Sequence, residues 1–167
     1  MAMDIKRLGK HLLGNRARVR RAFPHSALAE IEKAIKTSEA RHAGQIRFVV
    51  EGALDGRPLL AGQAARERAL DVFSHLRIWD TEHNSGVLIY LLLADRDVEI
   101  VADRGIDAKV GAERWHAICA RMEAEFRQGR FKSGVLEGIA QITADLATHF
   151  PVHGAHRNEL PDPPVVL

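Results

Sequence analysis

The chain has 167 residues, of which 46% are hydrophobic and 28% are charged, and its formal net charge is +2. This size and composition fit one globular domain with a substantial core. The single cysteine, Cys119, excludes an internal disulfide and a multi-cysteine zinc site. The longest apolar run, residues 87–94, is far shorter than the roughly 20 residues that span a bilayer. No signal peptide is visible at the N-terminus, so we expect a cytoplasmic protein.

Positive charge is concentrated at the N-terminus. Residues 1–23 carry seven Lys or Arg side chains and one acid, Asp4, whereas the rest of the chain is mildly acidic. The aliphatic residues that interleave these charges have roughly helical spacing: Ile5, Leu8, Leu12 and Val19. This basic arm is typical of two arrangements, an amphipathic helix on an anionic membrane or a solvated helix packed on the domain. We expect an anionic membrane surface or a protein as partner rather than nucleic acid, because aromatic stacking residues do not interleave the arm's charges.

Helical and strand patterns alternate along the rest of the chain. In chain order, the sequence predicts a helix from Ser26 to about residue 41, a strand at 45–53, a turn at 55–58, a helix at 63–76, strands at 86–94 and 97–102, and helices at 112–128 and 131–150. We divide the chain into the arm (1–23), the domain (24–151) and a proline-rich C-terminal tail (152–167) without periodicity, which we expect to be flexible.

The connections between the strands predict the sheet. A helix between the strands at 45–53 and 86–94 implies a parallel crossover. Asp95-Arg96 is too short for a crossover, so the next strand pairs in antiparallel fashion. The strand at 86–94 shows no polar alternation, which indicates that both of its faces are covered. The predicted fold class is therefore α/β, a three-layer α/β/α sandwich around a small mixed sheet.

Acidic and amide side chains gather at both ends of the predicted hairpin, and carboxylates in loops are the ligands that Ca²⁺ and Mg²⁺ prefer. The open end of the hairpin carries Asp80, Asn84, Asp103 and Asp107, and its turn end carries Asp95 and Asp97. Strands of this length separate the two groups by roughly 25 Å, so one metal site cannot use both. The open end is our first candidate and the turn end the alternative. The chain has no G-x-S-x-G elbow, phosphate loop or dinucleotide fingerprint.

Two segments resemble the motifs of the TPM domain family. They read NSGVLIYLLLADRDVEIVADRGI at residues 84–106 and FRQGRFKSGVLEGI at residues 126–139. The resemblance extends from residue 26 to 150 and implies an α/β/α sandwich. It also implies one of three roles: an acid phosphatase, a Ca²⁺-binding protein or a membrane-associated accessory protein. Asp103 stands where the family has the first glycine of a G-x-G turn, a position that favours positive φ.

Two functions follow as hypotheses. The first is a TPM-like binding or accessory module that acts at the inner membrane surface through the basic arm. The alternative is a metal-assisted phosphomonoester hydrolase, in which Ca²⁺ or Mg²⁺ activates water and Arg96 or Arg104 holds the phosphate.

Overall fold

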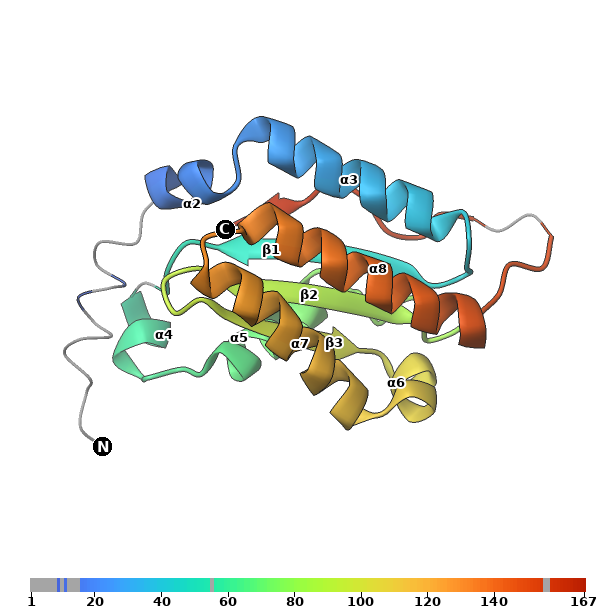
Figure 1. The fold of residues 1–167 in the computed structure, drawn as a ribbon. Coiled ribbons are helices and arrows are strands. Elements are labelled where there is room, and N and C mark those ends of the chain that lie inside the picture. Colours follow the sequence, from blue (N-terminus) through green and yellow to red (C-terminus); the bar gives the residue numbers. More distant parts are fainter. Residues whose placement is uncertain (1–8, 10, 12–15, 55, 155–156) are drawn as a thin grey trace.

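The computed structural model describes residues 9, 11, 16–54, 56–154 and 157–167, and Figure 1 shows their arrangement. Its helices are α2 (Arg16–Ala22), α3 (His25–Glu39), α4 (Gly56–Leu60), α5 (Ala65–His75), α6 (Arg104–Val110), α7 (Ala112–Arg127) and α8 (Phe131–His149). Its strands are β1 (Gln45–Glu51), β2 (Gly86–Leu92), β3 (Asp97–Ala102) and β4 (Val165–Val166).

The four strands form one mixed sheet in the order β3-β2-β1-β4. β1 and β2 are parallel and β2 and β3 antiparallel, which confirms both predicted pairings. Within the hairpin, Leu92 lies opposite Asp97 and Val87 lies opposite Ala102. The two groups of predicted metal ligands therefore lie at opposite ends of the sheet.

Helices cover both faces of the sheet (Figure 1), as predicted for an α/β/α sandwich. Every residue of β2 is buried, and its side chains point alternately to the two sides. Val87, Ile89 and Leu91 pack in the core formed with α2, α3, α7 and α8. Leu88 and Tyr90 pack in a second core formed with α5. This double burial explains the continuous apolar run that the sequence shows.

The described part of the basic arm packs on the domain. Val19 of α2 is 2% exposed, and Phe23, just after it, is 1% exposed; both belong to the core formed with α3. Three of the four aliphatic residues on which the amphipathic pattern rested, Ile5, Leu8 and Leu12, lie outside the described residues. The solvated-helix interpretation thus fits residues 16–23. In the part of the chain that the structure describes, no helix has the length and apolar character needed to cross a membrane.

The C-terminal segment differs from the flexible tail we expected. Strand β4 pairs with Val49 and Val50 of β1, and Leu160 is only 8% exposed in the α5-side core. The side-chain oxygen of Gln45 accepts hydrogen bonds from the backbone of Glu159 and Leu160. The prolines suppress helical and strand periodicity, but an irregular segment still becomes ordered when it covers an open sheet edge.

Candidate functional site

The three predicted carboxylate ligands at the open end of the hairpin are engaged with protein groups, and Asn84 contributes backbone hydrogen bonds. Asp80 forms an exposed ion pair with Arg77 at 2.8 Å. Asp107 accepts a hydrogen bond from the indole Nε1 of Trp115 at 2.9 Å. Asp103 is the N-cap of α6, and its Oδ1 accepts from the backbone N–H of Arg104. Each carboxylate therefore already has a structural role.

Asp103 does not occupy a position that requires glycine. Its φ is −68°, the extended conformation typical of an N-cap. The close approach occurs instead at Gly105, where a Cβ atom would lie 2.6 Å from the carbonyl oxygen of Asn84. The backbone N–H of Ile106 also bonds that oxygen at 3.2 Å. The glycine that the family has at this position suits a positive φ, but in this chain Asp103 is the N-cap of α6, a helix that the sequence did not predict.

The described residues at the open end of the hairpin provide few ligands for a cation. Among the described residues, no three His, Cys, Asp or Glu side chains lie close enough to share a metal ion. Two buried side-chain oxygens at this end have no hydrogen-bond partner among the described residues, Oδ2 of Asp103 and Oγ of Ser85. Arg104 is exposed and follows Asp103 directly. The four-ligand site stays a prediction.

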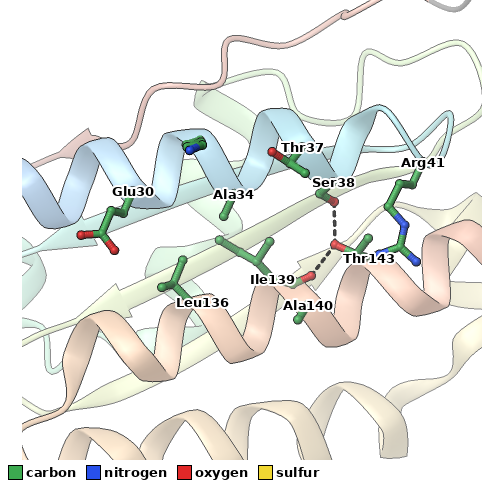
Figure 2. A pocket seen from close by; sticks show the side chains of 10 residues that line it. Glu30, Ala34, Thr37, Ser38, Arg41, Leu136, Ile139, Ala140 and Thr143 are labelled. Carbon is green, nitrogen blue, oxygen red and sulfur yellow. Dashed lines mark hydrogen bonds between the residues drawn. The ribbon is translucent and has the colours of Figure 1, made fainter.

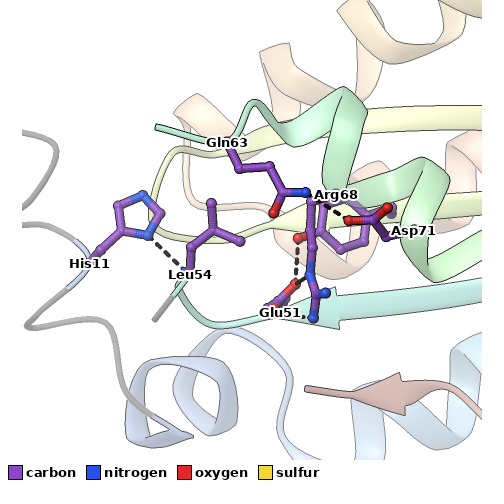
Figure 3. A network of polar contacts seen from close by, with 7 residues as sticks. His11, Glu51, Leu54, Gln63, Arg68 and Asp71 are labelled. Carbon is purple, nitrogen blue, oxygen red and sulfur yellow. Dashed lines mark hydrogen bonds and ion pairs between the residues drawn. The ribbon is translucent and has the colours of Figure 1, made fainter. Parts of the chain in front are cut away.

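At the other end of the sheet, the hairpin turn is held by a buried histidine. His11 Nδ1 accepts a hydrogen bond from the backbone N–H of Leu54 at 2.8 Å (Figure 3). Its Nε2 lies 3.2 Å from Oδ2 of Asp95. Because Nδ1 is an acceptor, the hydrogen of the neutral ring is on Nε2 and is donated to Asp95. Asp95, one of the two alternative metal ligands, is thus a partner of the N-terminal arm; Asp97 begins β3 opposite Leu92.

A second polar cluster lies at the end of β1. The Glu51 carboxylate accepts the hydroxyl of Tyr90 at 2.6 Å and both Nε and Nη2 of Arg68, at 2.9 and 3.0 Å (Figure 3). Burial, followed by the hydrogen bond to Glu51, raises the pKa of Tyr90 above its usual value. The Arg68–Glu51 hydrogen bond raises the pKa of Arg68. Each of these donors has an acceptor within the cluster, and the hydrogen bonds between Arg68 and Glu51 connect α5 to β1.

Three arginines line one pocket beside the hairpin turn at Asp95-Arg96. Arg18 and Arg21 of α2 line a pocket of about 360 Å³ together with Arg96 of the hairpin turn. Leu93 and Phe131 also line this pocket, which we call the turn-end pocket. Arg21 and Arg96 are exposed, and neither forms an ion pair with a described carboxylate. The arrangement presents concentrated positive charge beside an apolar wall.

The sequence identified Arg96 as a candidate phosphate ligand and residues 1–23 as a basic arm, but it did not bring them together. The structure separates Arg96 from Arg104, at the far end of the hairpin, and places Arg96 with Arg18 and Arg21. No local sequence pattern predicts that these arginines line one pocket, because residues 18 and 96 come close only through the packing of α2 on the sheet. The concentration of arginines in residues 16–21 was the available signal.

Comparisons with known proteins agree with this fold. The structure resembles that of the BA42 protein from the psychrophilic bacterium Bizionia argentinensis, with a TM-score of 0.74, 29% identity, and coverage of 85% of this chain and 93% of that chain. It also resembles the N-terminal domain of a P. gingivalis protein, with a TM-score of 0.62, 20% identity, and coverage of 78% and 83%. No curated protein matches the chain. The TPM domain model matches residues 21–145, and the chain belongs to the TPM domain family.

Proposed function

We propose that this protein is a binding module that attaches to an anionic membrane surface through the turn-end pocket. The observation that carries the proposal is the meeting of Arg18, Arg21 and Arg96 around one cavity of about 360 Å³. Arginine suits this task because its guanidinium group donates paired hydrogen bonds to phosphate oxygens. The proposal puts the protein in the cytoplasm, at the inner face of the membrane, where anionic lipids attract basic segments.

The membrane contact that we propose is electrostatic and does not require α2 to insert into the bilayer. Val19, the apolar residue that α2 would need for insertion, is 2% exposed and packs in the domain core. Arg21 and Arg96 are exposed and Arg18 is partly exposed. Each basic residue near an anionic membrane contributes on the order of 1 kcal/mol to binding. Screening shortens the reach of these charges to about 8 Å at physiological ionic strength. Binding should therefore weaken steeply as salt is added.

Vesicle co-sedimentation of the full chain tests this proposal. We expect binding to phosphatidylcholine vesicles that contain phosphatidylserine and little binding to phosphatidylcholine alone. Arg21→Gln and Arg96→Gln should each weaken the anionic binding roughly fivefold. Arg121→Gln, an exposed arginine of α7 outside the pocket, is the matched control and should bind as the parent chain does. Equal binding to both kinds of vesicle, or equal losses in all three variants, would overturn the proposal.

The metal-assisted phosphomonoester hydrolase is our alternative proposal. Its support is Oδ2 of Asp103, which is buried and has no hydrogen-bond partner in the described part of the chain, beside the exposed Arg104. Hydrolysis of p-nitrophenyl phosphate with Ca²⁺ or Mg²⁺, compared between the parent chain and Asp103→Asn, tests it. Metal-dependent turnover that Asp103→Asn abolishes would support the alternative. Turnover at background level with either metal would eliminate it.

A further inference from the structure

A groove of about 600 Å³ runs between α3 and α8 and shares no residue with the turn-end pocket. We call it the α3–α8 groove. Its middle is walled by Ala34 of α3 and by Leu136 and Ile139 of α8 (Figure 2). Glu30 lies toward one end and Arg41 toward the other (Figure 2). The groove thus has an apolar middle between two charged ends, within the size range of small-molecule sites.

The charge of the groove is unbalanced in favour of the cations. Glu30 is already paired with Lys132 of α8 at 2.9 Å. Lys33 and Arg41 also line the groove, and neither forms an ion pair with a described carboxylate. A ligand that complements these charges carries a negative group at the end marked by Arg41.

The hydroxyl groups in the wall restrict which atoms hold that negative group. Thr143 donates its hydrogen to the carbonyl oxygen of Ile139 at 2.6 Å. The oxygen of Ser38 lies 2.6 Å from that of Thr143 and 2.7 Å from Nε2 of His42. The hydrogens of both hydroxyls are therefore committed inside the protein. The donors left for a ligand are the guanidinium group of Arg41, the ammonium group of Lys33 and the hydroxyl of Thr37, three exposed residues that line the groove.

From these features we infer that the α3–α8 groove binds an amphiphilic carboxylate, a small acid with an unbranched hydrocarbon chain. The planar guanidinium fork of Arg41 matches a carboxylate, with Thr37 as a further donor. The hydrocarbon chain lies along Ala34, Leu136 and Ile139 and removes their apolar surface from water. This inference goes beyond the proposed membrane attachment, because it involves another face and another ligand.

The test uses the full chain and three probes that separate charge from chain length. Octanoate carries both features, octanol has the hydrocarbon chain alone, and acetate has the carboxylate alone. In ¹H–¹⁵N NMR titrations, we expect octanoate to shift the amide signals of α3 and α8. Its dissociation constant should be at least fivefold lower than that of octanol or acetate. Arg41→Gln should weaken octanoate binding roughly two- to fivefold. Arg77→Gln, an exposed arginine outside the groove, should leave it unchanged.

A steric variant keeps the test independent of charge. Ala140 is exposed and lines the groove, so Ala140→Trp fills the cavity without disturbing the core. We expect it to abolish octanoate binding while the unfolding midpoint stays unchanged. Equal affinity for octanoate and octanol, shifts confined to residues outside α3 and α8, or unaltered binding in Ala140→Trp would each overturn the inference.

Discussion

The hydroxyl oxygens of Ser38 and Thr143 lie 2.6 Å apart, although 105 residues separate them in the sequence. They join the last turn of α3 to α8 in a buried chain of contacts that ends at His42, whose Nδ1 lies 3.1 Å from the carbonyl oxygen of Gly44. The chain contains four contacts: Gly44–His42, His42–Ser38, Ser38–Thr143 and Thr143–Ile139. A neutral histidine and two hydroxyls supply only three hydrogens, so one contact is not a hydrogen bond.

This count of hydrogens predicts unequal effects of removing the two hydroxyls. Thr143→Val leaves Ser38 free to donate to His42 and should cost less than about 1 kcal/mol of unfolding free energy. Ser38→Ala removes the buried contact between the Ser38 hydroxyl and Nε2 of His42 and should cost about 1–3 kcal/mol. Urea unfolding of the two variants measures the difference. A larger loss in Thr143→Val than in Ser38→Ala would contradict this assignment of the hydrogens.

The stability of the protein should fall as the pH rises above the acid range, because of Glu39. Burial first, and then the nearby Asp162, raise the pKa of Glu39 from 4.5 to about 8, although the backbone N–H of Ile46 donates to its Oε1. The folded state holds this proton more tightly than the unfolded state does. The stabilisation is therefore complete below pH 4.5 and is lost as the pH rises to about 8.

Glu39→Gln isolates this effect. Glutamine keeps an oxygen acceptor for Ile46 but does not ionise, so its unfolding free energy should vary less between pH 5 and pH 9 than that of the parent chain. Urea midpoints at pH 5, 7 and 9 provide the measurement. Parallel curves for the two proteins would contradict the assignment to Glu39.

Arg96 allows folding and binding to be separated at one position. Its φ is 54°, a left-handed conformation that costs a side-chain-bearing residue on the order of 1–2 kcal/mol. Arg96→Gly relieves this cost but loses about 0.5–1 kcal/mol through the greater freedom of the unfolded chain. We expect thermal stability that equals or slightly exceeds that of the parent chain. Binding to anionic vesicles should nevertheless weaken, because a charge leaves the turn-end pocket.

Comparing the melting temperature with vesicle affinity checks this prediction. A variant that loses both would indicate that Arg96 acts through the fold. A variant that keeps both would remove Arg96 from the proposed site.

The C-terminal segment should be necessary for a stable monomer. Leu167 donates its backbone N–H to Val50 at 3.0 Å, and the carbonyl oxygen of Pro163 accepts from Arg47 at 3.3 Å. A chain that ends at residue 157 loses the burial of Leu160, which alone contributes about 1.5–3 kcal/mol. It also leaves the outer edge of β1 unpaired, and unpaired edges promote association between chains.

Urea unfolding and light scattering after size exclusion measure these two effects. Leu160→Ala keeps the backbone of the segment and serves as the control. Leu160→Ala should lose stability but stay monomeric. The truncated chain should lose more stability and should also associate. A truncated chain with the stability and mass of a normal monomer would show that β4 contributes nothing.

The central hairpin was predictable because its signals are local. The uninterrupted apolar run of β2, the short turn at Asp95-Arg96 and the alternation in β3 determine their pairing without reference to the rest of the chain. The motifs of residues 84–106 and 126–139 identified the family for the same reason. By contrast, α6 is too short for its periodicity to be recognised, and β4 has only two residues, which gain their conformation from β1.

The sequence by itself determined the fold class, the buried strand and the excess of positive charge at the N-terminus. These follow from hydrophobic periodicity and from composition, which each segment carries alone. Only the tertiary structure decided that Arg96 meets Arg18 and Arg21, and that Ser38 meets Thr143. Such meetings depend on which helix packs on which face of the sheet, and that choice is made by the whole core rather than by any one segment.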